Sequence, residues 1–346
     1  MSSTFAPIFE RRHRQSRIPR ANVYRQPAFS DLPTGPSPKV ATMISPFVRR
    51  RRLAMELNRL REGKGLTTGR LAQDIGVSRQ RISRLQNAHV PPDLDDVRRI
   101  LARLNVAEPE WTTLMNVARQ AQERGWWEKW ADEMGPRQAL TANLEAGAAT
   151  IREYQLTLVP GLLQTPAYTD SRATIDHPTR GAQFDRIRSL EAREIRQEMM
   201  TRPDGPRYEV IIDELAVRRP AVDPHTMAGQ LEYLAGVGHS REHLTVRVLP
   251  LDARITCHAV PSSAFSVYTY PDPADPVVVT VDTATADLLL AYQPQVDYYL
   301  ELYEHLQGAC LSPAESLSFL ACAAEELHST KGYEDGEGTR GGSELA

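Results

Sequence analysis

Apolar residues in the first third of the chain recur every three or four positions, which is the spacing of a helix with one buried face. Leu53, Leu57 and Leu60 form such a stripe behind Ser45-Pro46, an N-cap followed by proline at the first helical position. Shorter helices are predicted at 67–75, 78–87, around Val97–Leu104, and at 108–124. This pattern predicts a compact all-α domain.

The rest of the chain mixes two apolar patterns. Runs rich in β-branched and aromatic residues predict strands at Tyr208–Asp213, Leu244–Leu249, Ala264–Tyr270 and Val277–Asp282. Helical spacing predicts helices at 295–306, at 312–328, and at 186–200 with Ile187, Leu190, Ile195 and Met199 near one face. Because strands and helices do not alternate regularly, this half is expected to be α+β.

The segment Leu66–Ala88 has the residue pattern of a helix-turn-helix. Leu71 lies on the inner face of the first helix of the pair, and Gly76 permits the positive φ of a short turn. Ile82 and Leu85, three positions apart, anchor the next helix inward. The remaining side chains of that helix are therefore expected to point outward.

These outward side chains suit DNA. Arginine pairs bidentately with guanine and glutamine with adenine, so Arg79, Gln80 and Arg84 are the predicted base-reading residues, whereas Arg81 reads a base or binds phosphate. The start of the preceding helix is a place for phosphate. The full set of predicted DNA-binding residues is Thr67, Thr68, Ser78, Arg79, Gln80, Arg81, Ser83 and Arg84. The alternative is a solvated charged face, which the absence of any acid on this helix disfavours.

The charge distribution agrees with DNA binding. Residues 1–100 hold 20 Lys+Arg against 8 Asp+Glu, and the remainder holds 21 against 36. A basic front joined to an acidic back favours a polyanion-binding module linked to something else. Residues 1–42 are rich in proline and arginine and are predicted to be a disordered basic tail that attracts DNA, or else an over-called translation start before Met43. Arg49–Arg52 either add electrostatic attraction or form the solvated side of the first helix.

Length and composition narrow the class of protein. The 346 residues suit two domains, and no apolar stretch is long enough to span a membrane. The three cysteines form no CxxC pair, so a disulfide framework and a zinc ribbon are both disfavoured and a cytoplasmic setting is expected. The predicted boundaries are 1–42 for the tail, 43–122 for the DNA-binding domain, 123–328 for the α+β domain and 329–346 for a flexible end.

The segment Leu66–Ala88 resembles the XRE-type (Cro/repressor-like) helix-turn-helix family. The chain departs from the family pattern at three positions: Thr68 replaces a glutamine, Gln86 a glutamate and Ala88 the closing glycine. The resemblance implies an N-terminal all-α helix-turn-helix domain, to be joined here to the C-terminal α+β domain.

A second resemblance covers roughly 100–328. The segments 124–127 (RGWW), 151–154 (IREY), 158–168 (LVPGLLQTPAY), 212–220 (IDELAVRRP) and 246–250 (VRVLP) occur here in this order. Together they resemble actinobacterial, antitoxin-like regulators with a large C-terminal domain of unknown function. The resemblance implies transcriptional regulation, often beside a small neighbour-encoded partner protein, and leaves the ligand of the domain open.

Polar residues inside or beside these segments are the candidates for a second site. They are Glu145, Tyr154, Gln164, Asp213, Arg218 and Arg219. A structural Asp/Glu–Arg network is the default interpretation, because buried charges are usually paired; an effector pocket or a docking face for a protein is the alternative. No catalytic triad, nucleophile elbow or phosphate loop is present, so no enzyme, no metal and no cofactor are expected.

These observations predict a cytoplasmic, sequence-specific transcriptional regulator. Its helix at 78–87 would enter the major groove of a double-stranded operator, and the protein would act as a homodimer because one such module buries little DNA surface. The C-terminal domain would dimerise or bind an effector or partner. The alternative function is an antitoxin-like interaction protein that binds a small neighbour-encoded protein and uses DNA only for autoregulation.

Overall fold

The computed structural model describes residues 44–88, 90–176, 186–283 and 287–337. The predicted tail over 1–42 lies outside these residues, as does the end of the chain after Glu337. All the described residues belong to one unit of the chain.

The N-terminal part is helical, as predicted from its apolar spacing. Its helices are α1 (Pro46–Gly63), α2 (Thr68–Asp74), α3 (Arg79–Gln86), α4 (Leu94–Arg103) and α5 (Glu110–Gln120). Ser45, Thr67 and Ser78 each cap a helix by accepting a hydrogen bond from a backbone N–H in its first turn. Gly76 has φ +71° between α2 and α3, which confirms the predicted turn.

The core of this part is apolar. Leu53, Leu57, Leu71, Ile82 and Val97 are all at most 1% exposed and pack in one cluster. Burying each side chain of this size contributes about 1.5–3 kcal/mol, so the cluster holds α1 to α5 together without polar groups.

The second part is α+β, which confirms the predicted class. Its helices are α6 (Ala131–Glu145), α7 (Pro166–Asp176), α8 (Arg186–Glu198), α9 (Glu214–Arg218), α10 (Pro224–Ser240), α11 (Gln293–Ala309) and α12 (Pro313–Glu337), with short 3-10 turns η1 (Trp126–Trp130) and η2 (Gly161–Leu163) among them. Its strands are β1 (Thr150–Gln155), β2 (Arg207–Asp213), β3 (Leu244–Leu249), β4 (Phe265–Thr269), β5 (Val278–Asp282) and β6 (Asp287–Leu290).

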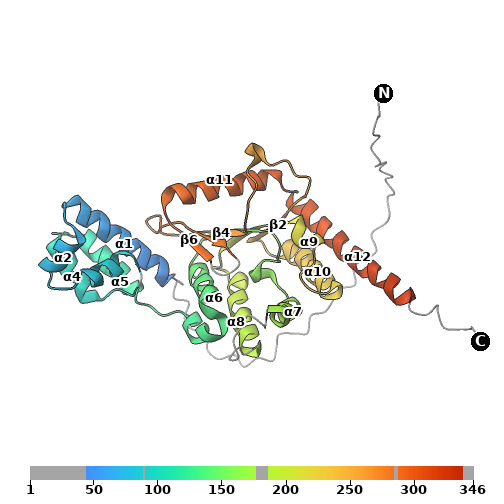
Figure 1. Cartoon of the computed structure of the whole chain (residues 1–346), viewed down its shortest axis with the longest axis horizontal. Coiled ribbons are helices and arrows are strands. Elements are labelled where there is room, and N and C mark those ends of the chain that lie inside the picture. Colours follow the sequence, from blue (N-terminus) through green and yellow to red (C-terminus); the bar gives the residue numbers. More distant parts are fainter. Residues whose placement is uncertain (1–43, 89, 177–185, 284–286, 338–346) are drawn as a thin grey trace, which may run out of the picture. The chain divides into compact units, whose positions relative to one another are not determined.

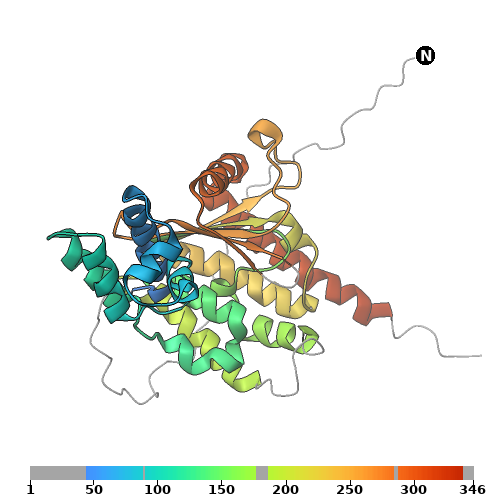
Figure 2. The same ribbon diagram turned by 60° about the vertical axis from the view of Figure 1, so that its left-hand side comes forward.

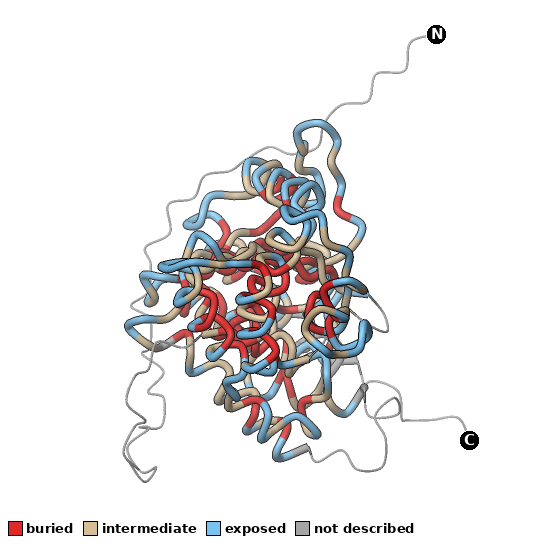
Figure 3. Tube along the Cα trace, turned by 90° about the vertical axis from the view of Figure 1, so that its left-hand side faces the viewer, coloured by how far each residue is buried: buried red, intermediate tan, exposed pale blue. Residues whose placement is uncertain are grey.

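The strands form one mixed sheet in the order β3-β2-β1-β4-β5-β6. β1, β2 and β3 are parallel, and β4, β5 and β6 continue from β1 in antiparallel pairs. Helix α11 covers one face of the sheet, and α6, α7, α8, α10 and α12 lie on the other (Figures 1 and 2). Most buried apolar residues of this part gather in two clusters, one on each face of the sheet. Figure 3 shows the buried residues of the chain in red, in the interior of the molecule.

The structure differs from the predicted elements in several places, and helices α6, α9 and α10 were not predicted. β1 lies in the middle of the sheet and β6 at one edge, and neither strand was predicted. α12 continues past residue 328, where the domain was expected to end. In α8 the predicted apolar stripe does not form the buried face, because Ile187 is 70% exposed while Ala192 is fully buried.

Helix α1 contacts both parts of the chain. Arg49 lies 2.9 Å from Asp275, and Arg52 pairs with Asp272, both carboxylates being in the β4–β5 loop. The hydrogen bond from Arg52 lowers the pKa of Asp272 to about 2. Arg49 and Arg52 therefore have internal partners, whereas the sequence suggested solvent or DNA for them.

Candidate nucleic-acid interface

Helix α3 separates its side chains as predicted. Ile82 is fully buried and Leu85 is 6% exposed, so both anchor the helix to the core. Arg79, Gln80 and Arg84 are exposed, and so is the capping residue Ser78. Ser83 is half-buried. The exposed face thus presents two guanidinium groups and one amide, which are the groups that read base edges in a major groove.

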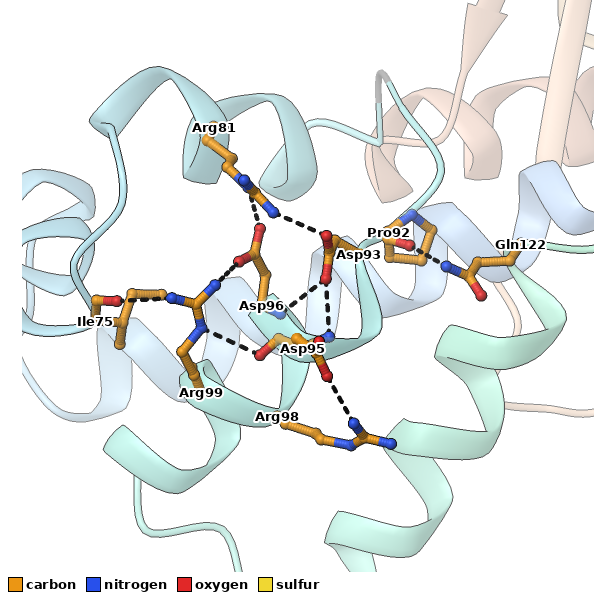
Figure 4. A network of polar contacts seen from close by, with 9 residues as sticks. All are labelled: Ile75, Arg81, Pro92, Asp93, Asp95, Asp96, Arg98, Arg99 and Gln122. Carbon is orange, nitrogen blue, oxygen red and sulfur yellow. Dashed lines mark hydrogen bonds and ion pairs between the residues drawn. The ribbon is translucent and has the colours of Figure 1, made fainter.

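Arg81 lies in an ion-pair network with the start of α4 (Figure 4). Its Nη2 donates to Asp93 at 2.9 Å, and its Nε donates to Asp96. Asp96 also accepts from Arg99 at 2.5 Å, and its side chain is only 3% exposed. The acids absent from α3 are therefore supplied by α4, and they hold Arg81 in one orientation.

Asp93 has two roles in this network. Its Oδ1 accepts hydrogen bonds from the backbone N–H groups of Asp95 and Asp96, which caps α4. These hydrogen bonds keep the pKa of the Asp93 carboxyl below its ordinary value, with a smaller contribution from Arg81. Arg81 is therefore held by two carboxylates at the start of α4, and its predicted roles, base reading or phosphate binding, both stay predictions.

The predicted phosphate contacts at the start of α2 differ from each other. Thr67 is exposed and accepts a hydrogen bond from the backbone N–H of Arg70, which leaves its hydroxyl able to donate to a further group. Thr68 is half-buried and donates to Gln86 Oε1 at 3.3 Å. Two of the departures from the XRE pattern therefore contact each other, and Thr67 is the better placed of the two threonines for phosphate.

The third departure has a backbone consequence. Ala88 follows α3 with φ +57°, in the left-handed region that glycine adopts without strain. This position is where the XRE pattern has its closing glycine. Helix α3 is thus followed by a left-handed residue that carries a Cβ.

The six residues predicted for a second site lie in three different places. Tyr154 donates to Asp213 at 2.9 Å, and both belong to the face of the sheet under α11. Asp213 also caps α9 by accepting from the N–H of Leu215. Burial raises the pKa of Tyr154, so this phenol stays protonated and acts as a donor.

Arg218 and Arg219 are exposed on the surface at α9. Arg218 pairs with Glu214 at 3.1 Å and with Glu326 of α12. The predicted Asp/Glu–Arg network is thus present here as the Glu214–Arg218 pair, whereas Asp213 contacts Tyr154 and the cap of α9. Exposed pairs of this kind contribute about 0–1 kcal/mol.

Glu145 and Gln164 each accept hydrogen bonds from an arginine of α8. Arg196 donates to both carboxylate oxygens of Glu145, at 2.6 Å from Nε, and the two side chains are 11% and 3% exposed. Arg193, one turn earlier on α8, donates to Gln164 Oε1. The structural ion pair that the sequence suggested for Glu145 is thus present, with a partner that the sequence did not identify.

Gly161, in the LVPGLLQTPAY segment, lies against the same arginines. A Cβ at this position would come within 3.3 Å of Arg196 Nη1. The φ of Gly161 is not in the left-handed region, so the space that this glycine leaves for Arg196 explains it better than a turn does. Thr165 caps α7 by accepting a hydrogen bond from the backbone N–H of Tyr168.

No helix in the described ranges is long and apolar enough to cross a membrane. No group of His, Cys, Asp and Glu side chains in these ranges is arranged to hold a metal ion.

The helical N-terminal part and the exposed face of α3 define a protein with a helix-turn-helix domain, and residues 52–114 match the family model of a helix-turn-helix domain. Residues 138–322, more than half of the chain, match the family described as domain of unknown function (DUF5753), and the chain belongs to this family. Comparisons with curated proteins and with solved structures gave no match. The family matches say nothing of an antitoxin or an organism, so the resemblance to antitoxin-like regulators stays a prediction.

Proposed function

We propose that the protein is a sequence-specific DNA-binding transcriptional regulator that acts in the cytoplasm and is not an enzyme. The observation that carries the proposal is the division of α3. Its inward residues Ile82 and Leu85 fix the helix to an apolar core, while Arg79, Gln80 and Arg84 are exposed on the opposite side. A helix presented in this way can enter a major groove and read base edges.

The electrostatics around α3 support this proposal. The acids nearest to the helix, Asp93 and Asp96, are engaged by Arg81 and Arg99 and by the cap of α4. They therefore offset Arg81 rather than Arg79 or Arg84. Arg81, held at the edge of the face, would position a phosphate while the other two arginines reach bases.

A homodimer is part of the proposal. A single helix-turn-helix module buries little DNA surface, and a two-fold pair on two half-sites gives the affinity that regulation needs. The C-terminal domain would supply the dimer contact or bind an effector. A light-scattering mass equal to one chain, both free and with operator DNA, would contradict the dimer.

The test is selection of sheared genomic DNA by the purified protein at near-physiological salt, because lower salt exaggerates non-specific binding. The variant Arg79→Ala/Gln80→Ala/Arg84→Ala runs beside wild type, with Arg59→Ala/Arg98→Ala/Arg119→Ala as a control that removes exposed arginines outside α3. Wild type and control are expected to recover one motif, and the α3 variant none. Equal, motif-free recovery by wild type and the α3 variant would overturn sequence-specific binding.

The rival function, binding of a small neighbour-encoded protein, has its own test. Purification of the tagged chain from its native host would recover such a partner in a fixed ratio. If the partner is recovered and no DNA motif is selected, the interaction function replaces the regulator.

A further inference from the structure

A polar cavity of about 260 Å³ lies between the sheet and the helices α6, α7 and α8. This volume lies just below the lower end of ordinary ligand pockets, which is about 300 Å³. The cavity therefore has room only for a very small molecule. Of the six residues that the sequence proposed for a second site, Gln164 lines it. The cavity is therefore a different place from the Tyr154–Asp213 contact and from the surface at α9.

The floor of the cavity is a row of buried polar side chains. Glu153, Ser266 and Thr280 lie directly opposite one another on β1, β4 and β5, and each is at most 8% exposed. The same face of the sheet carries apolar side chains elsewhere, among them Val210 and Val278. Burying polar groups is costly unless they are hydrogen-bonded, so a polar row in an apolar layer needs a reason.

The hydrogen bonds inside the described residues satisfy only part of this row. Glu153 accepts from Tyr208 and, at 2.7 Å, from Gln155. The hydroxyl of Thr280 has no hydrogen-bond partner among the residues that the structure describes, although it lines the cavity. A ligand atom in the cavity would supply that partner.

The β5–β6 side of the cavity is acidic. Asp282 and Asp287 lie 3.3 and 2.7 Å from Arg137, whose side chain is 44% exposed. Burial raises the pKa of Asp282 to about 6 in spite of this arginine, and it also raises the pKa of Glu153. Arg137 is thus shared by Asp282 and Asp287, and the cation nearest in effect to Glu153 is Arg196 of the opposite wall. The three carboxylates gathered on this side suit a cationic group.

The opposite wall is basic. It carries Arg172 of α7 and Arg193 and Arg196 of α8, and Glu145 is the carboxylate that pairs with Arg196. Gly161 leaves room beside the Arg193 and Arg196 guanidinium groups. Arginine recognises carboxylate and phosphate groups with two parallel hydrogen bonds, so this wall suits an anionic group.

We infer that this cavity binds a small zwitterion of the size of a free amino acid, with its ammonium group over Glu153, Thr280 and Asp282 and its acid group at Arg193. The inference rests on the part of the proposed function that gives the C-terminal domain an effector. Binding to the cavity needs no DNA, so the two can be tested apart.

The experiment measures the melting temperature of the full-length protein with each of the twenty proteinogenic L-amino acids at 10 mM. For each one that raises the melting temperature, its amide and its N-acetyl derivative are tested as probes that lack one charge. A specific ligand raises the melting temperature by mass action. At least one amino acid is expected to do so, and both of its derivatives are expected to bind at least tenfold more weakly.

Two conservative variants locate the site. Thr280→Val keeps the shape of the side chain and removes the hydroxyl, and Arg193→Gln removes the charge; each is expected to weaken binding at least tenfold. Thr245→Val is the matched control, because Thr245 pairs with Glu209 on the other face of the sheet. No stabilisation by any amino acid, or equal binding by wild type, Thr280→Val and Arg193→Gln, would overturn the inference.

The same samples are tested for operator binding by fluorescence anisotropy. Amino-acid binding without DNA binding would leave this inference standing and contradict the proposed regulator. DNA binding without any amino-acid response would do the reverse.

Discussion

Arg81 of the helix-turn-helix domain and Arg196 of α8 differ in how far their guanidinium groups are exposed, although Arg81 has one buried partner, Asp96, besides Asp93. Arg81 meets Asp93 at the surface, where both side chains are about half exposed, at 50% and 52%. Arg196 meets Glu145 in the interior, at 11% and 3%. A surface pair can exchange its partner for a phosphate at little cost, whereas a buried pair is a fixed part of the fold. The first region is suited to bind a large polyanion and the second to enclose a small ligand.

The largest expected effect is in the interior. Glu145→Ala leaves the Arg196 guanidinium buried without its carboxylate, which is expected to lower the free energy of unfolding by about 3–5 kcal/mol. Urea denaturation measures this difference. Glu214→Ala, which breaks an exposed pair with Arg218, is the control and is expected to cost about 0–1 kcal/mol. Equal losses in the two variants would remove the contrast between buried and exposed pairs.

The next effect is on DNA binding. Arg84→Ala is expected to weaken binding to a selected operator by about 1–3 kcal/mol through loss of a base contact, without a change in the melting temperature. Fluorescence anisotropy measures the affinity. Arg98→Ala on α4 is the matched control and keeps wild-type affinity if α3 is the recognition helix. A larger loss in the control would place the interface on α4.

The network in Figure 4 gives an intermediate effect. Asp96→Asn weakens the contacts to Arg81 and Arg99, and it is expected to lower the free energy of unfolding by about 1–3 kcal/mol. It also frees the charge of Arg81 for a phosphate, so the slope of log K against log salt becomes steeper by up to about 0.9. An unchanged slope would show that Arg81 does not approach the DNA backbone.

A smaller effect, of opposite sign, is expected after α3. Ala88→Gly removes a Cβ from a residue with φ +57° and is expected to raise the free energy of unfolding by about 1 kcal/mol. Ala102→Gly, inside α4 and exposed, is the control and is expected to lower it by about 1 kcal/mol. Thermal unfolding of the two variants separates backbone strain from a general effect of glycine.

The smallest expected effect is a change in the free energy of unfolding with pH that depends on Asp282. The pKa of Asp282 is raised to about 6 by burial, so the folded state holds this proton more tightly than the unfolded state. Its contribution to stability is therefore fully present below the ordinary pKa of aspartate and is lost as the pH rises through about 6. Asp282→Asn is expected to be more stable than wild type at pH 7.5, with the difference shrinking at pH 5. A difference that does not depend on pH would contradict the raised pKa.

Features set by neighbouring residues could be predicted from the sequence. The caps at Ser45, Thr67 and Ser78 and the turn at Gly76 follow from the residue types within a few positions. The predicted strands were rich in β-branched residues, and the structure contains them. The outward set Arg79, Gln80 and Arg84 followed from the spacing of Ile82 and Leu85.

Features that depend on distant partners could not be predicted. β1 has the sequence TIREYQ, whose two charged residues hide a central strand, because Glu153 is compensated by Tyr208 far along the chain. Arg49 and Arg52 were predicted to face solvent or DNA, because their partners Asp275 and Asp272 lie 226 and 220 residues further along the chain. In α8 the inward face is set by the Arg196–Glu145 ion pair and the lining of the cavity, and not by the apolar stripe. The cavity had one sign in the sequence. Thr280 and Asp282 are polar residues in the otherwise apolar run VVVTVD.

Helix α1 has a consequence for any attempt to separate the domains. Leu53 and Leu57 belong to the N-terminal core, but Val48, one turn earlier, is 1% exposed within the core of the sheet domain. The border between the two domains therefore runs through a continuous helix rather than through a linker. In a fragment that ends at residue 122, Val48, Arg49 and Arg52 would be exposed to water. The measured DNA affinity of the fragment would then include attraction from Arg49 and Arg52, which in the whole protein are paired with Asp275 and Asp272.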